Sequence, residues 1–470
     1  MKYVSTRGTA PELEFEDVLL TGLAADGGLY VPAEWPRFSA DDIRAMRAMS
    51  YEEIALAVMT PLIGDAVAAD ELEHMVREAY GQFSHEAVVP LSQLAENHWL
   101  LELFHGPTLA FKDVAMQVLG RLMDHALTRR GARASVVAAT SGDTGGAAIE
   151  AFRGRDAVDI FVLHPRGKVS EVQRRQMTTV LDANVHNIAI EGTFDDCQSL
   201  VKAMFNDQNF RQCTALAGVN SINWARIMAQ TVYYFSTAVA LGAPDRPVSY
   251  CVPTGNFGDI YAGYAAKRMG LPIENLVIAT NVNDILARTL KSGRYETHGV
   301  VATASPSMDI QVSSNFERLL FEVYDRSAED VKRLMSGLQQ SGAFSLSDGP
   351  FKALNAQFSA GRSDEAETAA TILKTLQQTG KLIDPHTAVA LHVANHMERD
   401  PAIPMVSLST AHPAKFPDAV NAASGVYPNL PDRLADLGER EERLAVLPND
   451  LDAVQDFIAT RSRAVKESHT

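Results

Sequence analysis

One lysine lies where an apolar stretch passes into a helix. Lys112 belongs to the stretch HGPTLAFKD, and Leu109, Ala110, Phe111 and Val114 surround it in sequence. A helix N-terminus disfavours a cation, and apolar surroundings weaken the hold of a lysine on its proton. Such a lysine is an amine nucleophile that can form a Schiff base with a carbonyl cofactor such as pyridoxal phosphate. The alternative is a lysine whose ammonium extends to water, and charge placement alone favours neither.

Two polar loops with glycines follow predicted strands. TSGDTGG (140–146) follows the strand 135–140, and PTGNFGD (253–259) follows the strand 247–252. Ligands of α/β sheets bind beyond the carboxyl ends of the strands, where a helix N-terminus with glycines offers N–H groups to phosphate or carboxylate. Neither loop has the Gly-Lys-Ser/Thr or Gly-x-Gly-x-x-Gly pattern. They are either two ordinary turns or, together with Lys112, a site for two anionic groups.

Two further stretches carry side chains suited to chemistry. NSINWAR (220–226) opens a predicted helix, and its arginine suits phosphate or carboxylate. A helix cap with a surface arginine is the equal alternative. STAHPAKF (409–416) follows the strand 405–408, and its His412 is more typical of a structural histidine. The sequence has no zinc or serine-hydrolase pattern, so we expect no metal site.

The elements that position these stretches change in kind along the chain. Residues 1–98 are predicted to form a mainly helical N-terminal domain with capping boxes at Ser39 and Ser50. From residue 99, strands alternate with helices, which predicts an α/β fold of two parallel-sheet lobes. We expect the smaller lobe over 99–240, the larger over 241–430, and a helical tail over 431–470, with a solvated helix over 433–443. The segment 298–315 is predicted to be a loop.

Composition restricts the class of partner. The chain has 470 residues, a net charge of −16 and only three cysteines. This charge disfavours a nucleic-acid or anionic-membrane partner, and few cysteines are typical of a reducing compartment. No apolar run is long enough to span a bilayer, and the N-terminus lacks a signal peptide. We therefore expect a cytoplasmic protein with a small-molecule substrate. Its oligomeric state, monomer or dimer, stays open.

The motifs resemble those of a known enzyme family. HGPTLAFKD, TSGDTGGAA, NSINWARI, PTGNFGDIYAG and STAHPAKF occur in the order found in threonine synthases. The opening YVSTRG with EDVLLTGLAADGGLYVP is similar to the longer branch of that family, found in enterobacteria and fungi. The resemblance extends to about residue 430. It implies fold type II of the pyridoxal 5'-phosphate (PLP) enzymes, similar to the tryptophan synthase β subunit. It also implies the conversion of O-phospho-L-homoserine and water to L-threonine and phosphate.

The resemblance implies a role for each motif. Lys112 matches the lysine that carries PLP and exchanges protons with the substrate. Other positions match cofactor-binding residues, namely Asp143, Gly255, Asn256, Phe257, Gly258, Asp259 and Thr410. The substrate-binding positions are Ser141, Gly142, Thr144, Asn220, Ser221 and Arg226. Among these, Gly255–Gly258 would cradle the cofactor phosphate, Arg226 would grip the substrate phosphate, and the Thr410 hydroxyl would face the pyridine nitrogen.

Two rival functions share these motifs. A phospho-lyase of the same fold would release 2-oxobutyrate instead of guiding water to the substrate. A catalytically silent relative would bind PLP and serve as a partner protein. Cysteine-synthase and dehydratase activities are more distant, because neither needs a grip on a substrate phosphate of the Asn220–Arg226 kind.

Overall fold

The computed structural model describes residues 1–465, which divide into two compact units. Unit 1 comprises Met1–Val18, Gly22–His105 and Ser221–Pro428, and unit 2 comprises Leu19–Thr21, Gly106–Asn220 and the residues that follow Pro428. The chain passes between the units at His105–Gly106 and at Asn220–Ser221, inside two of the motifs. The four-part domain division made from the sequence stays a prediction.

Unit 2 is built on a five-stranded parallel sheet with the strand order β16-β8-β7-β6-β9. Its strands are β6 (Ala134–Ala139), β7 (Val158–Pro165), β8 (Val185–Glu191), β9 (Leu216–Ala217) and β16 (Ala445–Pro448). All eight residues of β7 are buried. A central parallel strand is covered on both faces, so its sequence is mainly apolar and not alternating, with Asp159 and His164 as its two polar residues.

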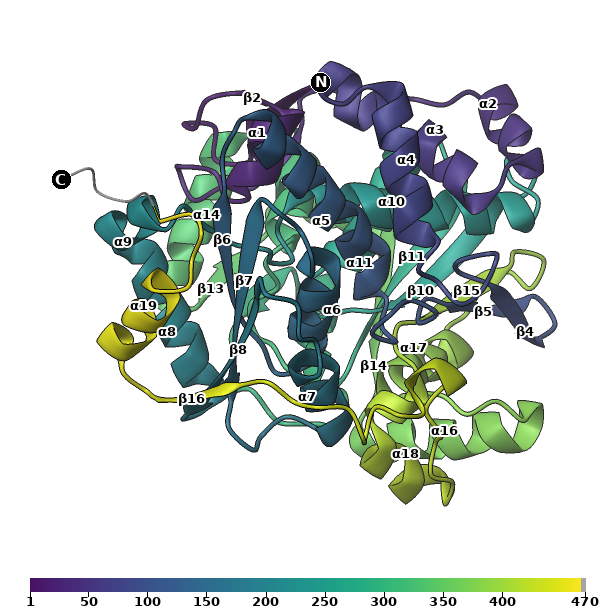
Figure 1. Cartoon of the computed structure of the whole chain (residues 1–470). Coiled ribbons are helices and arrows are strands. Elements are labelled where there is room, and N and C mark those ends of the chain that lie inside the picture. Colours follow the sequence, from purple (N-terminus) through teal and green to yellow (C-terminus); the bar gives the residue numbers. More distant parts are fainter. Residues whose placement is uncertain (466–470) are drawn as a thin grey trace. The chain divides into compact units, whose positions relative to one another are not determined.

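Helices cover both faces of this sheet (Figure 1). Alternate side chains of β6, β7 and β8, such as Phe161 and Ile188, pack in one core with α8 (Phe194–Asn206) and α19 (Leu451–Ala459). On the other face, α5 (Lys112–Arg129) packs against α6 (Asp143–Phe152). A Cβ at Gly120 would lie 2.3 Å from the Ala151 carbonyl oxygen, so these helices approach closely only because residue 120 is glycine. The remaining helices of unit 2 are α7 (Glu171–Thr178) and α9 (Gln208–Cys213).

Unit 1 contains a six-stranded sheet with the order β14-β11-β10-β15-β5-β4. Its strands are β4 (Leu91–Ala95), β5 (His98–Glu102), β10 (Val248–Pro253), β11 (Ile273–Thr280), β14 (Phe358–Arg362) and β15 (Met405–Ser409). Only β4 runs antiparallel to its neighbour. The strand β5, which precedes the Lys112 motif, pairs with β15 in this sheet. It therefore belongs to the sheet that carries the PTGNFGD loop, not to the sheet that carries TSGDTGG as we had predicted.

Helices also sandwich the sheet of unit 1. Val277 and Cys251 pack with α17 (Pro385–His396) on one face. On the other face, α11 (Gly258–Arg268) packs between the sheet and α10 (Trp224–Ala240), since a Cβ at Gly263 would touch Leu276 and Tyr234. These two sandwiches confirm the predicted α/β class. The other helices of five or more residues beyond residue 240 are α12 (Ile285–Ser292), α13 (Phe316–Val323), α14 (Ala328–Ser341), α15 (Asp348–Asn355), α16 (Glu365–Thr379) and α18 (Pro417–Ser424).

The N-terminal region of unit 1 combines helices with a small sheet. The sheet has the order β2-β1-β3, formed by β1 (Lys2–Ser5), β2 (Leu13–Glu14) and β3 (Tyr30–Pro32). The helices are α1 (Phe15–Thr21), α2 (Ala40–Ala45), α3 (Tyr51–Ile63) and α4 (Ala69–Tyr80). Both predicted capping boxes are present: Ser39 caps α2 with Asp42, and Ser50 caps α3 with Glu53. The predicted helical character of this region is thus confirmed.

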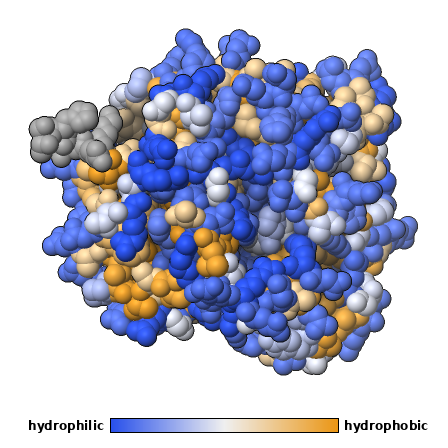
Figure 2. Space-filling model, in the orientation of Figure 1, coloured by the Kyte–Doolittle hydropathy of each residue, from blue (hydrophilic) through white to orange (hydrophobic). Residues whose placement is uncertain are grey.

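Two further features differ from the prediction. The predicted helix over 433–443 is wrong, because only a 3-10 turn over Asp432–Leu434 forms there. Its charged residues instead make local ion pairs, such as Arg440 with Asp436. The short strand β14 was not predicted, since Phe358–Arg362 has neither alternation nor an apolar run. The molecular face in Figure 2 is mainly hydrophilic, with hydrophobic residues gathered near β16, where Leu444 and Val446 are exposed.

Candidate functional site

In unit 2, Lys112 is the first residue of α5 and its side chain is buried. The residue is 7% exposed, which rules out the alternative in which the ammonium extends to water. Its Nζ lies 3.2 Å from Asp143 Oδ2 and 5.0 Å from the centre of the Phe111 ring. The structure thus brings together Lys112 and the predicted loop residue Asp143, 31 positions apart in the sequence.

Asp143 is itself held by a residue that the sequence did not single out. Gln173 Nε2 donates a hydrogen bond of 2.8 Å to Asp143 Oδ1, so the two carboxylate oxygens face different partners. The Gln173 Oε1 accepts from the Ser170 hydroxyl at 3.0 Å, and Ser170 also caps α7. A buried glutamine with both ends of its amide engaged has one orientation. No sequence signal marked Gln173, because it lies in the first turn of an ordinary polar helix.

The TSGDTGG loop closes on itself through Thr140. The Thr140 hydroxyl accepts from the N–H groups of Gly142 and Gly145, each at 2.9 Å. Gly142 has φ +141°, and a Cβ there would lie 2.5 Å from the Gln173 amide. A side chain at residue 142 would therefore displace the group that holds Asp143. The predicted substrate-binding residues Ser141 and Thr144 flank this turn, with Ser141 exposed and Thr144 half-buried.

In unit 1, the predicted phosphate loop lies between β10 and the N-terminus of α11. Phe257 has φ +63° and caps α11 without a side-chain hydrogen bond. Within residues 1–465, the N–H groups of Gly255, Asn256, Phe257 and Gly258 donate to no protein acceptor. Free N–H groups at the positive end of a helix form a site for a phosphate. The backbone present thus fits the phosphate of PLP.

Neighbouring residues hold the carbonyl groups of this loop outward. Ser313 Oγ donates to the Gly255 carbonyl at 2.6 Å, and Asn315 Nδ2 donates to the Asn256 carbonyl at 2.9 Å. A Cβ at Gly255 would lie 2.5 Å from the Ser307 carbonyl oxygen. The cradle is therefore supported by the irregular segment 298–315, which we had predicted to be a loop and which contains only a 3-10 turn over Pro306–Met308.

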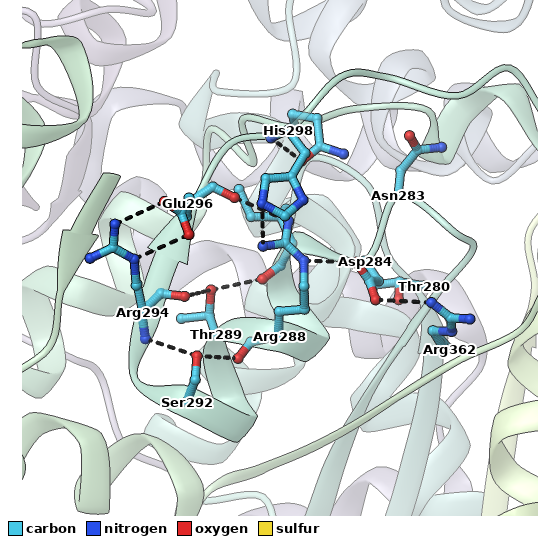
Figure 3. A network of polar contacts seen from close by, with 12 residues as sticks. Thr280, Asn283, Asp284, Arg288, Thr289, Ser292, Arg294, Glu296, His298 and Arg362 are labelled. Atoms are coloured by element: carbon cyan, nitrogen blue, oxygen red, sulfur yellow. Dashed lines mark hydrogen bonds and ion pairs between the residues drawn. The ribbon is translucent and has the colours of Figure 1, made fainter. Parts of the chain in front are cut away.

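A polar network anchors that segment and the strand β12 (Arg294–Glu296) before it (Figure 3). Asp284 accepts from Arg288 Nε at 2.8 Å and from Arg362 at 3.4 Å, and Arg288 donates to the Glu296 carbonyl at 3.0 Å. Asn283 Nδ2 donates to the Val301 carbonyl at 2.8 Å and to Asp309 at 3.0 Å. The network thus connects α12 and the end of β14 to the segment that supports Gly255.

Thr410 lies at the same sheet edge as the phosphate loop. β10 and β15 are parallel neighbours, and Cys251 is aligned with Ser407. Thr254 and Thr410 therefore follow at the same level, and Thr410 is buried. The strand register thus brings together two motifs separated by about 150 residues in the sequence. His412 accepts from the Ala414 N–H at 3.2 Å and caps a short turn, as expected of a structural histidine.

Arg226 is a buried cation in unit 1. It lies in the first turn of α10, is 4% exposed, and makes no ion pair or hydrogen bond through its side chain within the described chain. Burial lowers the pKa of Arg226 to about 10, so the guanidinium stays charged at neutral pH. An isolated buried charge is costly unless an anion compensates it. The alternative of a surface arginine is therefore wrong.

The neighbours of Arg226 are structural in large part. Asn223 caps α10 by accepting from the Ala225 N–H at 3.0 Å. The Ser221 carbonyl accepts from Asn315 Nδ2 at 3.1 Å, so the asparagine that supports the phosphate loop also holds this turn. Asn220 is the last residue of unit 2 before the chain enters unit 1. The Asp259 carboxylate accepts from the Tyr233 and Tyr234 hydroxyls, so its side chain is held by α10.

The predicted residues therefore fall into two groups, each gathered within one unit. Unit 2 holds Ser141, Gly142, Asp143 and Thr144 in one loop and Lys112 beside it. Unit 1 holds the phosphate loop, Thr410, Ser221 and Arg226. Among the residues described, no group of histidine, cysteine, aspartate or glutamate could hold a metal ion, and no helix is long and apolar enough to cross a membrane.

Family models match the chain in three consecutive regions. Residues 2–80 match the model "Threonine synthase N terminus", and residues 387–458 match "Threonine synthase, C-terminal". Residues 84–336 match "Pyridoxal-phosphate dependent enzyme". The third model covers more than half of the chain and includes Lys112, Asp143, Arg226 and the phosphate loop.

Curated proteins and solved structures show the same similarity. The chain is 54% identical to the threonine synthase of Pseudomonas aeruginosa, with 98% of each chain covered. It is 41% identical to that of Saccharomyces cerevisiae, with 97% of each chain covered. A PLP-bound threonine synthase from Brucella melitensis superposes with a TM-score of 0.97 at 62% identity, over 98% of this chain and 100% of that one. The Escherichia coli structure gives 0.82 at 31% identity, with 98% of this chain and 100% of that one covered.

Proposed function

We propose that this chain, which belongs to the threonine synthase family of PLP-dependent enzymes, converts O-phospho-L-homoserine and water to L-threonine and phosphate. The cofactor and the substrate each carry a phosphate group, and unit 1 contains two separate features suited to an anion. One is the phosphate loop at the start of α11, and the other is Arg226. We assign the cofactor phosphate to the loop and the substrate phosphate to Arg226.

The buried guanidinium of Arg226 is the observation that carries this proposal. A cofactor alone would need only the loop, whose N–H groups from Gly255 to Gly258 have no acceptor in the described part of the chain. Arg226 is 4% exposed and has no protein partner within residues 1–465. Its planar fork suits a phosphate bound through two hydrogen bonds. A second anion-binding group favours a phosphorylated substrate over the unphosphorylated substrates of dehydratases.

The balance of the reaction defines what the residues must do. The bond between the γ-carbon and the phosphate oxygen breaks, and the γ-carbon gains a proton. The β-carbon loses a proton and gains the hydroxyl of water. The phosphate leaves with the electron pair of the broken bond and so carries negative charge. Arg226 would stabilise this charge on the leaving phosphate. When bound, PLP would supply an electron sink that makes the proton on the amine-bearing carbon acidic, and then the protons on the neighbouring β-carbon.

Lys112 is the residue that we assign to proton transfer. Its Nζ is buried and lies 3.2 Å from Asp143 Oδ2, so its position is defined by a carboxylate and not by water. We propose that the same amine holds the cofactor through a Schiff base and exchanges protons with the substrate carbons when free. Ser141, Gly142 and Thr144 are proposed to bind the substrate from the adjacent loop, and Asn220 and Ser221 from the turn before Arg226.

Thr410 would determine the character of the sink. It follows β15 at the level of the phosphate loop, and its hydroxyl would be a neutral partner for the pyridine nitrogen. A hydroxyl does not stabilise a protonated pyridine as a carboxylate would. We therefore propose a milder sink, which limits side reactions at the amine-bearing carbon.

A product balance tests this function against its rivals. Purified holoenzyme is incubated with O-phospho-L-homoserine, and phosphate, threonine and 2-oxobutyrate are quantified. We expect threonine equal to phosphate. Phosphate accompanied by 2-oxobutyrate would assign the phospho-lyase activity instead. Absence of all three products in a protein that shows the visible absorption of bound PLP would identify a silent relative.

We also keep the cytoplasm as the proposed location. The three cysteines of the chain are unpaired, and Cys197 and Cys251 are buried. Unpaired cysteines are typical of a reducing compartment.

A further inference from the structure

A cleft of about 570 Å³ opens in unit 1 beside the segment that supports the phosphate loop. Its walls come from the N-terminal region, the segment 312–317, the antiparallel strands β12 (Arg294–Glu296) and β13 (Ala343–Ser345), and α14. This volume lies within the usual range of sites for small ligands. None of the residues that line the cleft belongs to the predicted cofactor-binding or substrate-binding set.

The cleft has an apolar floor and an exposed apolar rim. Three aromatic rings stack along it: Phe344 lies 4.8 Å from Tyr295, and Tyr295 lies 5.6 Å from Phe316, with nearly parallel planes. At the rim, Val312 is 53% exposed and Leu23 is 47% exposed. Large apolar side chains exposed around a concave surface indicate a binding site more than an ordinary surface.

Among the described residues that line this cleft, Lys332 is a cation without an ion-pair partner. The other charged groups that line it are satisfied within unit 1: Arg7 donates to Glu317 at 2.9 Å and 3.1 Å, and Asp26 accepts from the N–H groups of Thr9 and Gly28. Lys332 on α14 is half-buried, and it has no hydrogen-bond or ion-pair partner in the described chain. The lining therefore combines an apolar surface with one free cation.

The wall of the cleft is joined directly to the proposed cofactor site. Ser313 lines the cleft, and its hydroxyl donates to the Gly255 carbonyl at 2.6 Å. The Tyr295 hydroxyl, from the aromatic floor, accepts from the Ser313 N–H at 2.9 Å. A ligand that moves the floor or the segment 312–316 would shift the backbone that shapes the phosphate cradle.

We propose that this cleft is an effector site for a small apolar monocarboxylate. The carboxylate pairs with Lys332, and the aliphatic or aromatic body lies against Phe344 and the exposed side chains of Val312 and Leu23. Occupation of the site changes the affinity of the phosphate loop for the cofactor through Ser313. The coupling rests on the proposed role of Gly255–Gly258, whereas the binding itself does not.

Calorimetric titration of the holoenzyme with 3-phenylpropionate tests the binding. We expect saturation with a Kd of about 1 mM, as for a small ligand with one ion pair. The uncharged 3-phenylpropanol and the zwitterion L-phenylalanine are the comparison ligands, and each is expected to bind about tenfold more weakly. Lys332→Gln should weaken binding of the acid about tenfold. Lys352→Gln, which changes an exposed lysine of α15 outside the cleft, should leave it unchanged.

Each other outcome overturns part of the proposal. If none of the three ligands saturates the protein below about 10 mM, the cleft is not a binding site for this class of ligand. If Lys332→Gln binds 3-phenylpropionate as tightly as the parent protein does, Lys332 forms no ion pair with the ligand. The same conclusion would follow if the parent protein binds 3-phenylpropanol as tightly as 3-phenylpropionate. If L-phenylalanine binds more tightly than 3-phenylpropionate, the ligand of this site is a zwitterion and not a monocarboxylate.

The coupling is measured separately as the dissociation constant of PLP with and without saturating 3-phenylpropionate. We expect a change of about threefold or more. An unchanged constant would overturn the coupling and leave the binding site in place. Threonine formation without the effector is assayed in parallel, so failure of the proposed function is distinguished from failure of this site.

Discussion

The amide of Gln173 donates a hydrogen bond of 2.8 Å to Asp143 Oδ1, and the other oxygen of that carboxylate lies 3.2 Å from Lys112 Nζ. The three side chains come from the starts of α7, α6 and α5, so three helix N-termini of unit 2 converge on one carboxylate. Gln173 therefore determines which way Asp143 faces, and through it where the Lys112 amine lies.

Gln173→Glu should disturb this arrangement without removing any side chain that we assign to substrate. A second carboxylate beside Asp143 would repel it or share a proton with it. We expect kcat to fall about tenfold or more with a smaller change in KM, and the pH dependence of the visible absorption of bound PLP to shift. Gln208→Glu, at an exposed position of α9 in the same unit, is the control. A parent-like pH dependence in Gln173→Glu would mean that Gln173 only packs.

Arg226→Ala should separate substrate binding from cofactor binding. Loss of the guanidinium removes the proposed partner of the substrate phosphate, and we expect kcat/KM to fall by about two orders of magnitude. The Kd of PLP should change little. The temperature of thermal unfolding, measured without substrate, should not be lower than in the parent protein, because the variant no longer buries an unpaired charge. Equal losses of substrate and cofactor affinity would show that Arg226 is structural.

Gly255→Ala should weaken PLP binding through sterics alone. The new Cβ would lie 2.5 Å from the Ser307 carbonyl oxygen, so either the loop or the segment 298–315 must shift. We expect the Kd of PLP, measured by titration of the apoprotein, to rise about tenfold or more. At Gly349 a Cβ would meet nothing within 4 Å, which makes Gly349→Ala the matched control. An unaltered Kd in both variants would place the cofactor phosphate elsewhere.

Thr410→Asp should alter the electronic character of the cofactor. A carboxylate opposite the pyridine nitrogen would stabilise its protonated form. We expect a shifted visible absorption of the bound cofactor and a higher ratio of 2-oxobutyrate to threonine. Thr410→Ser, which keeps the hydroxyl, should preserve both. A parent-like spectrum and product ratio in Thr410→Asp would exclude this residue from contact with the ring nitrogen.

Glu102 should give the enzyme part of its acid sensitivity. Burial alone would raise the pKa of Glu102, but hydrogen bonds from His105, Ser92 and Lys381 outweigh it and lower the pKa from 4.5 to about 2. A carboxyl with a lowered pKa stabilises the folded state above its unfolded pKa, and this stability is lost as the pH falls from 4.5 towards 2. Glu102→Gln should therefore lose less stability than the parent protein over this window in denaturant titrations. If the difference in unfolding free energy between the two proteins stays constant over this pH range, the assignment to Glu102 is contradicted.

Much of the fold could be read from local patterns. The buried strands of both sheets appear as mainly apolar runs, and the capping boxes at Ser39 and Ser50 define where α2 and α3 begin. The strand β14 was missed because its pairing with β11 depends on a neighbour and not on its own residues. The helix expected over 433–443 was wrong, because the charges that suggest a solvated helix also suit an irregular surface segment.

Sequence alone determined which residue types stand at specific places along the chain: an apolar-flanked lysine, two glycine-bearing loops after strands, and an arginine at a helix start. Only the tertiary structure decided which of them meet. Strand register brings Thr410 level with the PTGNFGD loop, and the close packing of α5 and α6 brings Asp143 to Lys112. The tertiary structure also revealed the roles of Gln173 and of the segment 298–315, because these roles depend on contacts between residues distant in the sequence. Burial decided that Arg226 is not a surface residue, because solvent exposure is a property of the folded chain and not of a residue type.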